Sequence, residues 1–433
     1  MNLRRIRRLS LGIVTAACAE FVIATTGVQI RQLPHSTDFA SYWFAGQLTH
    51  EGRSPYDQAE IVRRGRALGF THDQFPFLYP PPFALVMQPF ARLSYPRARQ
   101  IWMLITTLEA LALVGATGLF MRALARELGI EDPCHYWVLL GAFVPAALNS
   151  PSVQTDLRAG SVGILLALLL TLLAHAMLRR RTLTTALTLA LATLAKLTPA
   201  ALIPYVWWRG ARRAAWLSVL LLALSMLPPV VHWGGWILPE YLHAGLLPSL
   251  HRENGWAHNQ SLDAVLTRFF VPSAMDAVPA TAPWPKHVLS AVLALAIAAY
   301  TWRVLARRER PPVLLPAELG LVVLTILILM KLTWVHTLAA MLFVWPALLL
   351  PILRAAERGA PWARRAGIAT CAGVFLSAAH LPILWGEHWR GPLVVVTGAH
   401  LYGMLILWGT TCFVLRHAHE VIGPLSDGAA GRP

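Results

Sequence analysis

Charged residues are scarce in this sequence. Asp, Glu, Lys and Arg make up only 13% of its 433 residues, whereas 56% are hydrophobic and the mean hydropathy is +0.53. A soluble domain carries about 25% charged residues. Apolar runs long enough to cross a bilayer recur along the whole chain. The composition therefore excludes an ordinary soluble protein and predicts an all-α integral membrane protein.

Acidic residues are the scarcer charged type, 21 against 37 Lys and Arg, and the formal net charge is +16. Such a balance can indicate nucleic-acid binding. Here, however, the cations form short clusters between apolar runs, for example at 179–181 and 209–213. This is the positive-inside pattern of membrane proteins. We therefore expect contact with membrane lipids and no binding of nucleic acid.

Cysteine clusters and nucleotide-binding loops are missing as well. The four cysteines lie in or beside apolar runs without metal-ligand spacing, so we expect neither a disulfide framework nor a metal site. The sequence has no glycine-rich nucleotide loop and no carboxylate cluster of the metal-binding type. We therefore expect neither a cofactor nor a metal.

The apolar runs predict one transmembrane domain over residues 1–416 and a cytoplasmic tail over 417–433. Because arginine clusters flank residues 182–208 on both sides, we interpret this stretch as a re-entrant pair of half-helices broken at LAKLTPA. The alternative is one ordinary span with one cluster outside. Two long excursions, 28–97 and 232–286, are expected on the outer side. Ten full spans are predicted near 9–27, 98–121, 135–149, 161–178, 214–231, 287–303, 314–332, 337–353, 366–384 and 394–415.

The first excursion contains Asp38, the residue on which our interpretation of the chemistry depends. It follows the first span, and residues 38–48 have helical spacing. A single carboxylate at the outer boundary suffices to take a proton from an acceptor hydroxyl. A lipid-phosphate sugar donor has a stable leaving group, so the second carboxylate of a glycosidase is dispensable. Lys196, Arg158 or His336 could hold the phosphate.

Each of these residues also has a structural interpretation. Asp38 could cap the helix that follows it. Lys196 could reach the interface or pair with a helix C-terminus, and His336 could be a satisfied interface histidine. Arg158 could simply flank the fourth span, Asn259 could cap a helix beginning at Ser261, and Trp334 could anchor the chain at the interface. The shared outer side of these residues favours a functional role.

Five short stretches follow one another along the chain: DFASYWFAGQLTHEGRSPYD (38–57), FLYPPPFALVMQPFARL (77–93), LAKLTPAALIPYVWWRG (194–210), HNQSL (258–262) and TWVH (333–336). Together they resemble the motifs of the family 87 glycosyltransferases, polytopic enzymes of the GT-C class. That family includes polyprenyl-phosphate-mannose-dependent mannosyltransferases and a related arabinofuranosyltransferase.

The resemblance implies a GT-C-type helical bundle and an inverting transferase that uses a polyprenyl-phosphate sugar on the side away from the cytoplasm. It assigns the role of general base to Asp38 and places His336 on the donor phosphate or sugar. Further positions that would line or shape the site are Tyr42, Tyr56, Tyr79, Lys196, Asn259 and Gln260, and we add Trp334 beside His336. Many family members carry a Gly-Gln-x-Asn-like motif where this chain reads Gly160, Ser161, Val162, Gly163, so two amide side chains are missing.

These observations predict a multi-pass enzyme of the bacterial inner membrane with a periplasmic or extracytoplasmic active site. It would transfer a sugar, with mannose as the first expectation, from a polyprenyl phosphate to a lipid-linked or cell-envelope glycan acceptor. Two alternatives stay open. One is transfer of arabinofuranose from the corresponding donor. The second is a transporter or flippase for lipid-linked sugars, which would share the spans but need no carboxylate base.

Overall fold

The computed structural model describes residues 3–29, 37–70, 75–130, 132–248, 254–271, 283–307, 310–378 and 397–422. Within these ranges every regular element is a helix, and one isolated antiparallel bridge joins Asn259 to Trp334. The prediction of an all-α fold is confirmed for this part of the chain. Residues 30–36 of the first excursion and most of the predicted tail lie outside the described residues.

The helices begin and end as follows. In the first half they are α1 (Leu3–Ile23), η1 (Ala24–Gln29), α3 (Thr37–His50), α4 (Gln58–Ala67), α5 (Pro81–Ala91), α6 (Tyr95–Glu127), α7 (Pro133–Leu148), α8 (Pro151–Ala159), α9 (Gly163–Leu178), α10 (Thr182–Ala195), η2 (Thr198–Ala201) and α11 (Leu202–Trp208). In the second half they are α12 (Arg212–Ser225), α13 (Leu227–Trp233), α14 (Ile237–Glu240), η3 (Tyr241–Leu246), α16 (Leu262–Phe270), α17 (Trp284–Leu305), η5 (Pro312–Leu314), α18 (Leu315–Leu329), η6 (Val335–Met341), α19 (Val344–Glu357), α20 (Ala363–Ala378), α22 (Ala399–Arg416) and α23 (Ala418–Ile422).

Six helical stretches in the described ranges are long and apolar enough to cross a membrane, which is fewer than the ten predicted spans. Two predicted spans correspond to α7 and α9, which have 16 residues each. A helix of that length covers about 24 Å, short of a hydrocarbon core of ~30 Å. The predicted spans near 366–384 and 394–415 run partly through residues outside the described ranges. The six stretches are Leu3–Gly27, Tyr95–Glu127, Arg212–Trp233, Trp284–Leu305, Pro312–Leu329 and Val335–Glu357.

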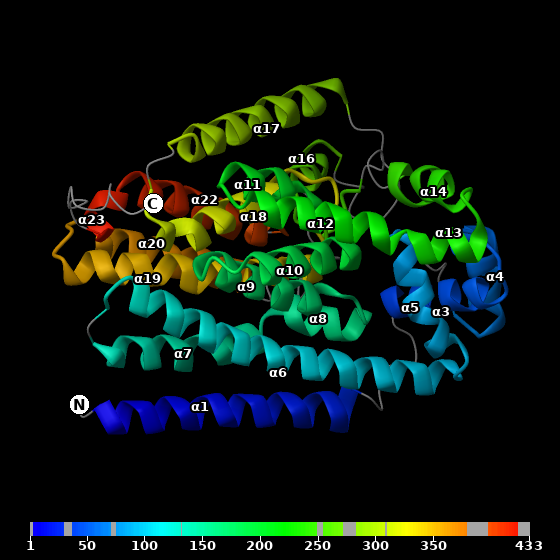
Figure 1. Ribbon diagram of the computed structural model, residues 1–433, viewed down its shortest axis with the longest axis horizontal. Helices are drawn as coiled ribbons and strands as arrows, with labels where there is room; N and C mark the ends of the chain where they lie inside the picture. Colours follow the sequence, from blue (N-terminus) through cyan, green and yellow to red (C-terminus); the bar gives the residue numbers. More distant parts are fainter. Residues whose placement is uncertain are drawn as a thin grey trace.

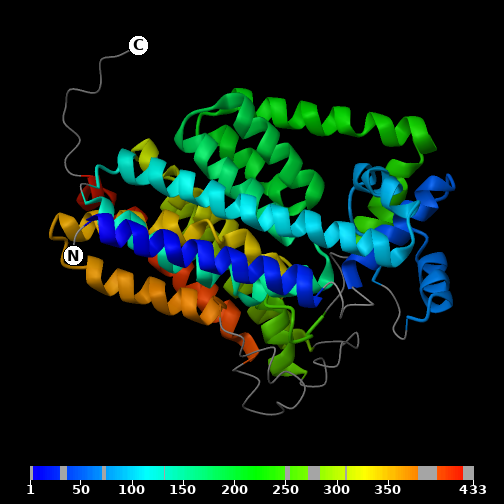
Figure 2. The same ribbon diagram turned by 90° about the horizontal axis from the view of Figure 1, so that it is seen from below.

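The long helices run side by side along the longest axis of the molecule. Figure 1 shows the start of α1 and the short α23 at one end, and α3, α4, α5, α13 and α14 at the other. The view from below in Figure 2 shows α1, α6 and α12 following the same axis. The arrangement separates a bundle of apolar helices from a group of short helices at one end, α3, α4, α5, α13 and α14, which we call the cap. Asp38 belongs to α3 and therefore to the cap.

The predicted break in 182–208 is present as a change of helix type. The α-helix α10 ends at Ala195, a 3₁₀ turn follows over Thr198–Ala201, and α11 continues from there. Pro199 contributes to the break, because its ring nitrogen has no N–H and so cannot continue the hydrogen bonds of α10. The arginine clusters at both ends lie beside the 305–318 link, which connects α17 to α18. Arg179 lines a cavity with Pro312, and Arg209 donates to the Leu305 carbonyl. Whether the pair is re-entrant stays a prediction.

A second apolar core fixes α3 in the cap. Phe39, Trp43 and Phe44 of α3 are buried together with Tyr95 and Trp102 of α6. A Cβ atom on Gly46 would lie 2.6 Å from the Met87 carbonyl oxygen, so α3 and α5 approach each other closely enough to exclude any side chain there. This packing leaves α3 little freedom to move, and it therefore holds the position of Asp38.

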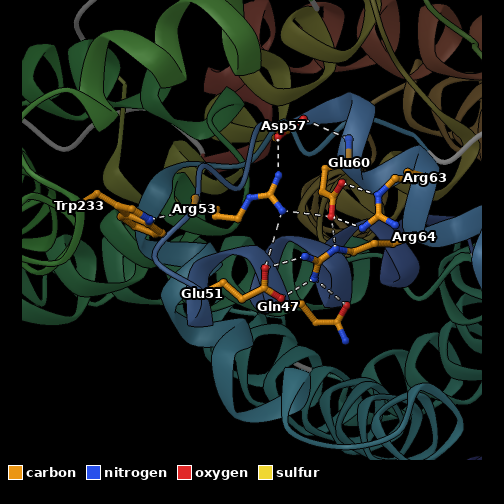
Figure 3. Close-up of polar contacts among 8 residues, drawn as sticks. All are labelled: Gln47, Glu51, Arg53, Asp57, Glu60, Arg63, Arg64 and Trp233. Atoms are coloured by element: carbon orange, nitrogen blue, oxygen red, sulfur yellow. Dashed lines mark hydrogen bonds and ion pairs between the residues drawn. The ribbon is translucent and has the colours of Figure 1, made fainter.

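A charged cluster fixes the corner between α3 and α4 (Figure 3). The Glu60 carboxylate accepts from Arg63 Nε at 2.7 Å and Arg64 Nε at 2.8 Å, and Arg53 lies 3.1 Å away. Trp233 of α13 donates its indole N–H to the Arg53 carbonyl at 3.0 Å. These bonds therefore hold together α4, the turn that follows α3, and α13.

Candidate active site

Asp38 and His336 come from distant parts of the chain and meet in the structure. Asp38 lies in the first turn of α3, and His336 is the second residue of η6. Asp38 Oδ2 and His336 Nε2 are 3.7 Å apart, and the two side chains are 18% and 11% exposed. This separation is longer than a hydrogen bond, yet short enough for both groups to contact the same substrate group. The structure thus brings the predicted base and the predicted donor-binding residue together, and their roles stay predictions.

Lys196 reaches the same place from the end of α10. Its ammonium donates to the Thr337 hydroxyl at 2.6 Å, one residue beyond His336. It also lies within electrostatic reach of Asp38 and Asp156. The break after Ala195 gives Lys196 an extended backbone, which places its side chain against η6. The structure thus brings three of the predicted site residues together.

Asp156 is a site residue that the sequence interpretation missed. It is completely buried and accepts from the backbone N–H groups of Gly163 at 2.8 Å and Ile164 at 2.9 Å, so it caps the start of α9. Burial raises the pKa of the Asp156 carboxyl to about 7, and these two N–H groups act in the opposite direction. One signal could have found it: Asp156 is the only acidic residue between Asp132 and Glu240.

The segment around Asp156 is held by the N-terminal part of α6. Arg99 donates to the Leu157 carbonyl at 2.6 Å, and Trp102 donates its indole N–H to the Gly160 carbonyl at 2.8 Å. Gly160 ends α8 with a φ of 66°, a left-handed conformation that favours glycine. The guanidinium of Arg99 also lies over the Phe39 ring, 5.8 Å from its centroid. Arg99 therefore positions the Asp156 turn and the start of α3 relative to each other.

Tyrosines form one wall beside Asp38. Tyr42, one turn further along α3, donates its hydroxyl to the hydroxyl of Tyr79 at 2.5 Å. Both phenols lie within electrostatic reach of Asp38. Tyr56 donates to the Tyr79 backbone carbonyl at 2.8 Å, so it supports Tyr79 from behind. Tyr42 and Tyr79 are placed to line the site, whereas Tyr56 is placed to shape it.

Asn259 and Gln260 use their amide groups to hold the chain that leads to His336. Asn259 donates to the Lys331 carbonyl at 2.9 Å and accepts from the Thr333 N–H at 2.9 Å. Gln260 donates its side chain to the Thr397 carbonyl at 2.9 Å. Both residues are completely buried. They shape the site by fixing the 331–335 segment. Ser261 is the residue that caps α16, in place of Asn259.

Trp334 and Arg268 complete this support. The Trp334 ring packs against Trp256 and Phe75, with centroids 5.6 and 6.4 Å away. Arg268 is completely buried and donates to the carbonyls of Trp256 at 2.9 Å and Asn259 at 2.8 Å. Nothing in the sequence pattern had singled out Arg268. It ties the loop before α16 to the helix itself and so positions Asn259.

Arg158 is placed differently from the other predicted residues. Its side chain is exposed on α8, and no contact joins it to Asp38, His336 or Lys196 in the described structure. Asp156 two residues earlier faces inward instead. A role of Arg158 in holding the donor stays a prediction. Among the described residues no group of three or more His, Cys, Asp or Glu side chains could hold a metal ion.

The chain matches the sequence model of Glycosyltransferase family 87 over residues 77–331, more than half of its length. The matched range contains Tyr79, Asp156, Lys196 and Asn259, whereas His336 lies shortly after its end and Asp38 lies well before its start. No curated protein matches the chain.

Proposed function

The chain belongs to glycosyltransferase family 87, and we propose that it transfers a sugar from a polyprenyl-phosphate donor to a hydroxyl of a lipid-linked or cell-envelope glycan acceptor. Its family makes it a glycosyltransferase, and its apolar helices make it a membrane protein. The observation that carries the proposal is the meeting of Asp38, His336 and Lys196 from three distant segments. Mannose is the first candidate sugar, and arabinofuranose is the second.

The proposed reaction is a single displacement. Asp38 takes the proton of the acceptor hydroxyl as its oxygen attacks the anomeric carbon. The bond between that carbon and the phosphate oxygen breaks, and the polyprenyl phosphate leaves with the electron pair. Because attack and departure occur on opposite faces, the anomeric configuration inverts. No side chain has to protonate the leaving group, since the departing phosphate is already a stable anion.

His336 and Lys196 are suited to the phosphate. The Lys196 ammonium has three N–H donors, and its bond to Thr337 uses one of them. His336 lies close to the carboxylate of Asp38 and within electrostatic reach of Lys196. A phosphate bound there would gain negative charge in the transition state close to a fixed cation, which is the arrangement that lowers the barrier most. The tyrosine pair Tyr42 and Tyr79 would face the sugar.

The site is proposed to lie on the extracytoplasmic side of a bacterial inner membrane. Asp38 belongs to the cap of short helices, at the opposite end of the molecule from the start of α1 and α23 (Figure 1). The arginine clusters 179–181 and 209–213 border the 305–318 link, well away from the cap. Positive loops stay in the cytoplasm, so the cap would face outward.

The direct test is turnover by purified protein. We expect label from a polyprenyl-phosphate mannose to appear in a new glycosidic product, and a chelator should leave the rate unchanged. Polyprenyl-phosphate arabinose is assayed in parallel to decide between the two sugars. If the protein forms no product with either donor but moves lipid-linked sugar across liposomes, the transporter alternative is correct and the proposed reaction is wrong.

Lys196→Gln tests the role of the cation. The variant should lose about 10²-fold in kcat/KM for the donor, because one charge-assisted contact to the phosphate is removed. Lys196→Arg keeps the charge and should retain more activity. Arg158→Gln removes an exposed charge nearby and should have the smaller effect. A larger loss in Arg158→Gln than in Lys196→Gln would reverse the two assignments. The measurement is kcat and KM over a range of donor concentrations.

A further inference from the structure

A second polar cluster lies where α16, α17 and α18 meet. Asp263 of α16 accepts from Lys286 Nζ at 2.7 Å and from Ser290 Oγ at 3.0 Å, both on α17. Lys331, just after α18, lies 3.0 Å from the other carboxylate oxygen. Lys286 is completely buried, whereas the Lys331 side chain is 35% exposed. Two ammonium groups thus share the Asp263 carboxylate, and the partly exposed Lys331 is the one nearer the surface.

A cavity of about 230 Å³ opens over this cluster. Its polar side is formed by Asp263, Ser290, His287 and Lys331, and its apolar side by leucine and alanine side chains that include Ala294 and Leu329. The Lys331 ammonium uses one donor on Asp263, so further donors remain for a ligand. The cavity therefore pairs a polar floor, where Lys331 has donors left for a ligand, with an apolar wall.

The surroundings of the cavity point toward lipid. In Figure 1, α17 lies on the outside of the bundle, and few of its residues are buried. Val288, Val292 and Leu295 form an exposed stripe with helical spacing next to the face that lines the cavity. Lys286 is in the first turn of α17 and Lys331 follows the end of α18 by two residues, so the cluster lies at the ends of two candidate spans, where lipid headgroups are expected.

From this geometry we infer that the cavity between α16, α17 and α18 binds the phosphate of an anionic lipid, whose chains lie along the exposed stripe of α17. Lys331 contacts the phosphate, and Lys286 shares the Asp263 carboxylate, so that Asp263 occupies only one donor of Lys331. Basic pockets between membrane helices recognise lipid headgroups in this way. The site shares no residue with Asp38, His336 or Lys196, and the inference does not depend on the proposed reaction. The lipid can be a membrane phospholipid or an isoprenoid phosphate.

Lys331→Gln and Ala294→Phe test the site independently. The first keeps a hydrogen-bond donor to Asp263 but removes the charge, and the second fills the cavity without touching the cluster. Binding is measured by thermal unfolding of the full chain in detergent, titrated with phosphatidylglycerol, undecaprenyl phosphate or neutral phosphatidylcholine. We expect either or both anionic lipids to stabilise the wild type, and both variants to bind about tenfold more weakly.

Matched controls separate this effect from general damage. Arg303→Gln removes one exposed charge at the other end of α17, and Ala296→Phe makes the same change as Ala294→Phe at an exposed position that lines neither the cavity nor the stripe. Both should bind as the wild type does. If Lys331→Gln and Ala294→Phe lose only phosphatidylglycerol binding, the ligand of the cavity is a membrane phospholipid. If they lose only undecaprenyl phosphate binding, the ligand is an isoprenoid phosphate. The inference is overturned if the wild type binds neither anionic lipid, or if both variants bind them as well as the wild type does.

The outcome is distinguishable from failure of the proposed reaction. Asp38→Asn lies outside this cavity and should show the lipid response of the wild type whether or not it transfers sugar. Normal lipid binding by a protein that does not transfer sugar would therefore support the lipid site and contradict the proposed reaction. Normal sugar transfer without lipid binding would contradict the lipid site alone.

Discussion

Asp38→Asn should lower kcat for sugar transfer by about 10³-fold, because the amide cannot take a proton from the acceptor hydroxyl. The substitution keeps the size of the side chain. It also keeps any capping function at the start of α3, since Asn caps a helix about as well as Asp. The expected loss therefore tests the base role separately from the capping alternative. Initial rates at saturating donor and acceptor are the measurement.

Asp57→Asn is the matched control for this prediction. Asp57 is a carboxylate of the same cap that accepts from the Glu60 N–H at 3.1 Å at the start of α4. It belongs to the charged cluster of Figure 3 and not to the candidate site. Its replacement should leave kcat unchanged. A kcat for Asp38→Asn equal to that of the wild type would show that another group removes the proton.

Gly163→Ala should reduce both activity and stability. A Cβ atom on Gly163 would lie 2.5 Å from the His336 carbonyl oxygen and 2.6 Å from Asp156 Oδ1. Neither neighbour can yield easily, because one is backbone and the other is a buried carboxylate that accepts from Gly163 and Ile164. The start of α9 and η6 must therefore separate, which moves His336 away from Asp38. A shift of about 1 Å can lower the rate about 10²-fold, and overpacking costs about 1–3 kcal/mol.

Gly115→Ala provides the control for size and helix propensity. A Cβ atom on Gly115, inside α6, would meet nothing within 4 Å. This variant should keep the wild-type kcat and unfold at the same or a slightly higher temperature, since alanine favours a helix more than glycine does. The measurements are kcat and the midpoint of thermal unfolding. A Gly163→Ala protein with wild-type values in both would show that α9 and η6 tolerate separation.

The same contact gives a physical reason for the departure from the family motif at residues 160–163. An Asn side chain at position 163 would overlap the His336 carbonyl and the Asp156 carboxylate as they are placed here. At position 161 the shorter Ser161 is buried close to Tyr42 and Tyr79, although its hydroxyl makes no hydrogen bond among the described residues. The site is therefore built more tightly at this turn than the motif would suggest.

Local features of the sequence predicted several elements correctly. The helical spacing of 38–48 corresponds to α3, the apolar run near 98–121 to α6, and the break at LAKLTPA to the end of α10. These features depend on neighbouring residues, so the pattern of a short window suffices. The number of spans was harder to predict, because α7 and α9 are apolar but shorter than a bilayer. For such helices the composition predicts an apolar surface, but it does not predict whether the helix crosses the bilayer.

The sequence by itself determined that this is an all-α membrane protein of a glycosyltransferase family, since apolar run length, cation clusters and short motifs are properties of the chain alone. Only the tertiary structure decided which polar groups meet. It brought Asp38 beside His336 and Lys196, revealed Asp156 beneath the start of α9, and turned the Arg158 side chain outward. The reason is that contacts between residues far apart in the chain depend on helix packing, and packing depends on the shapes of many side chains at once.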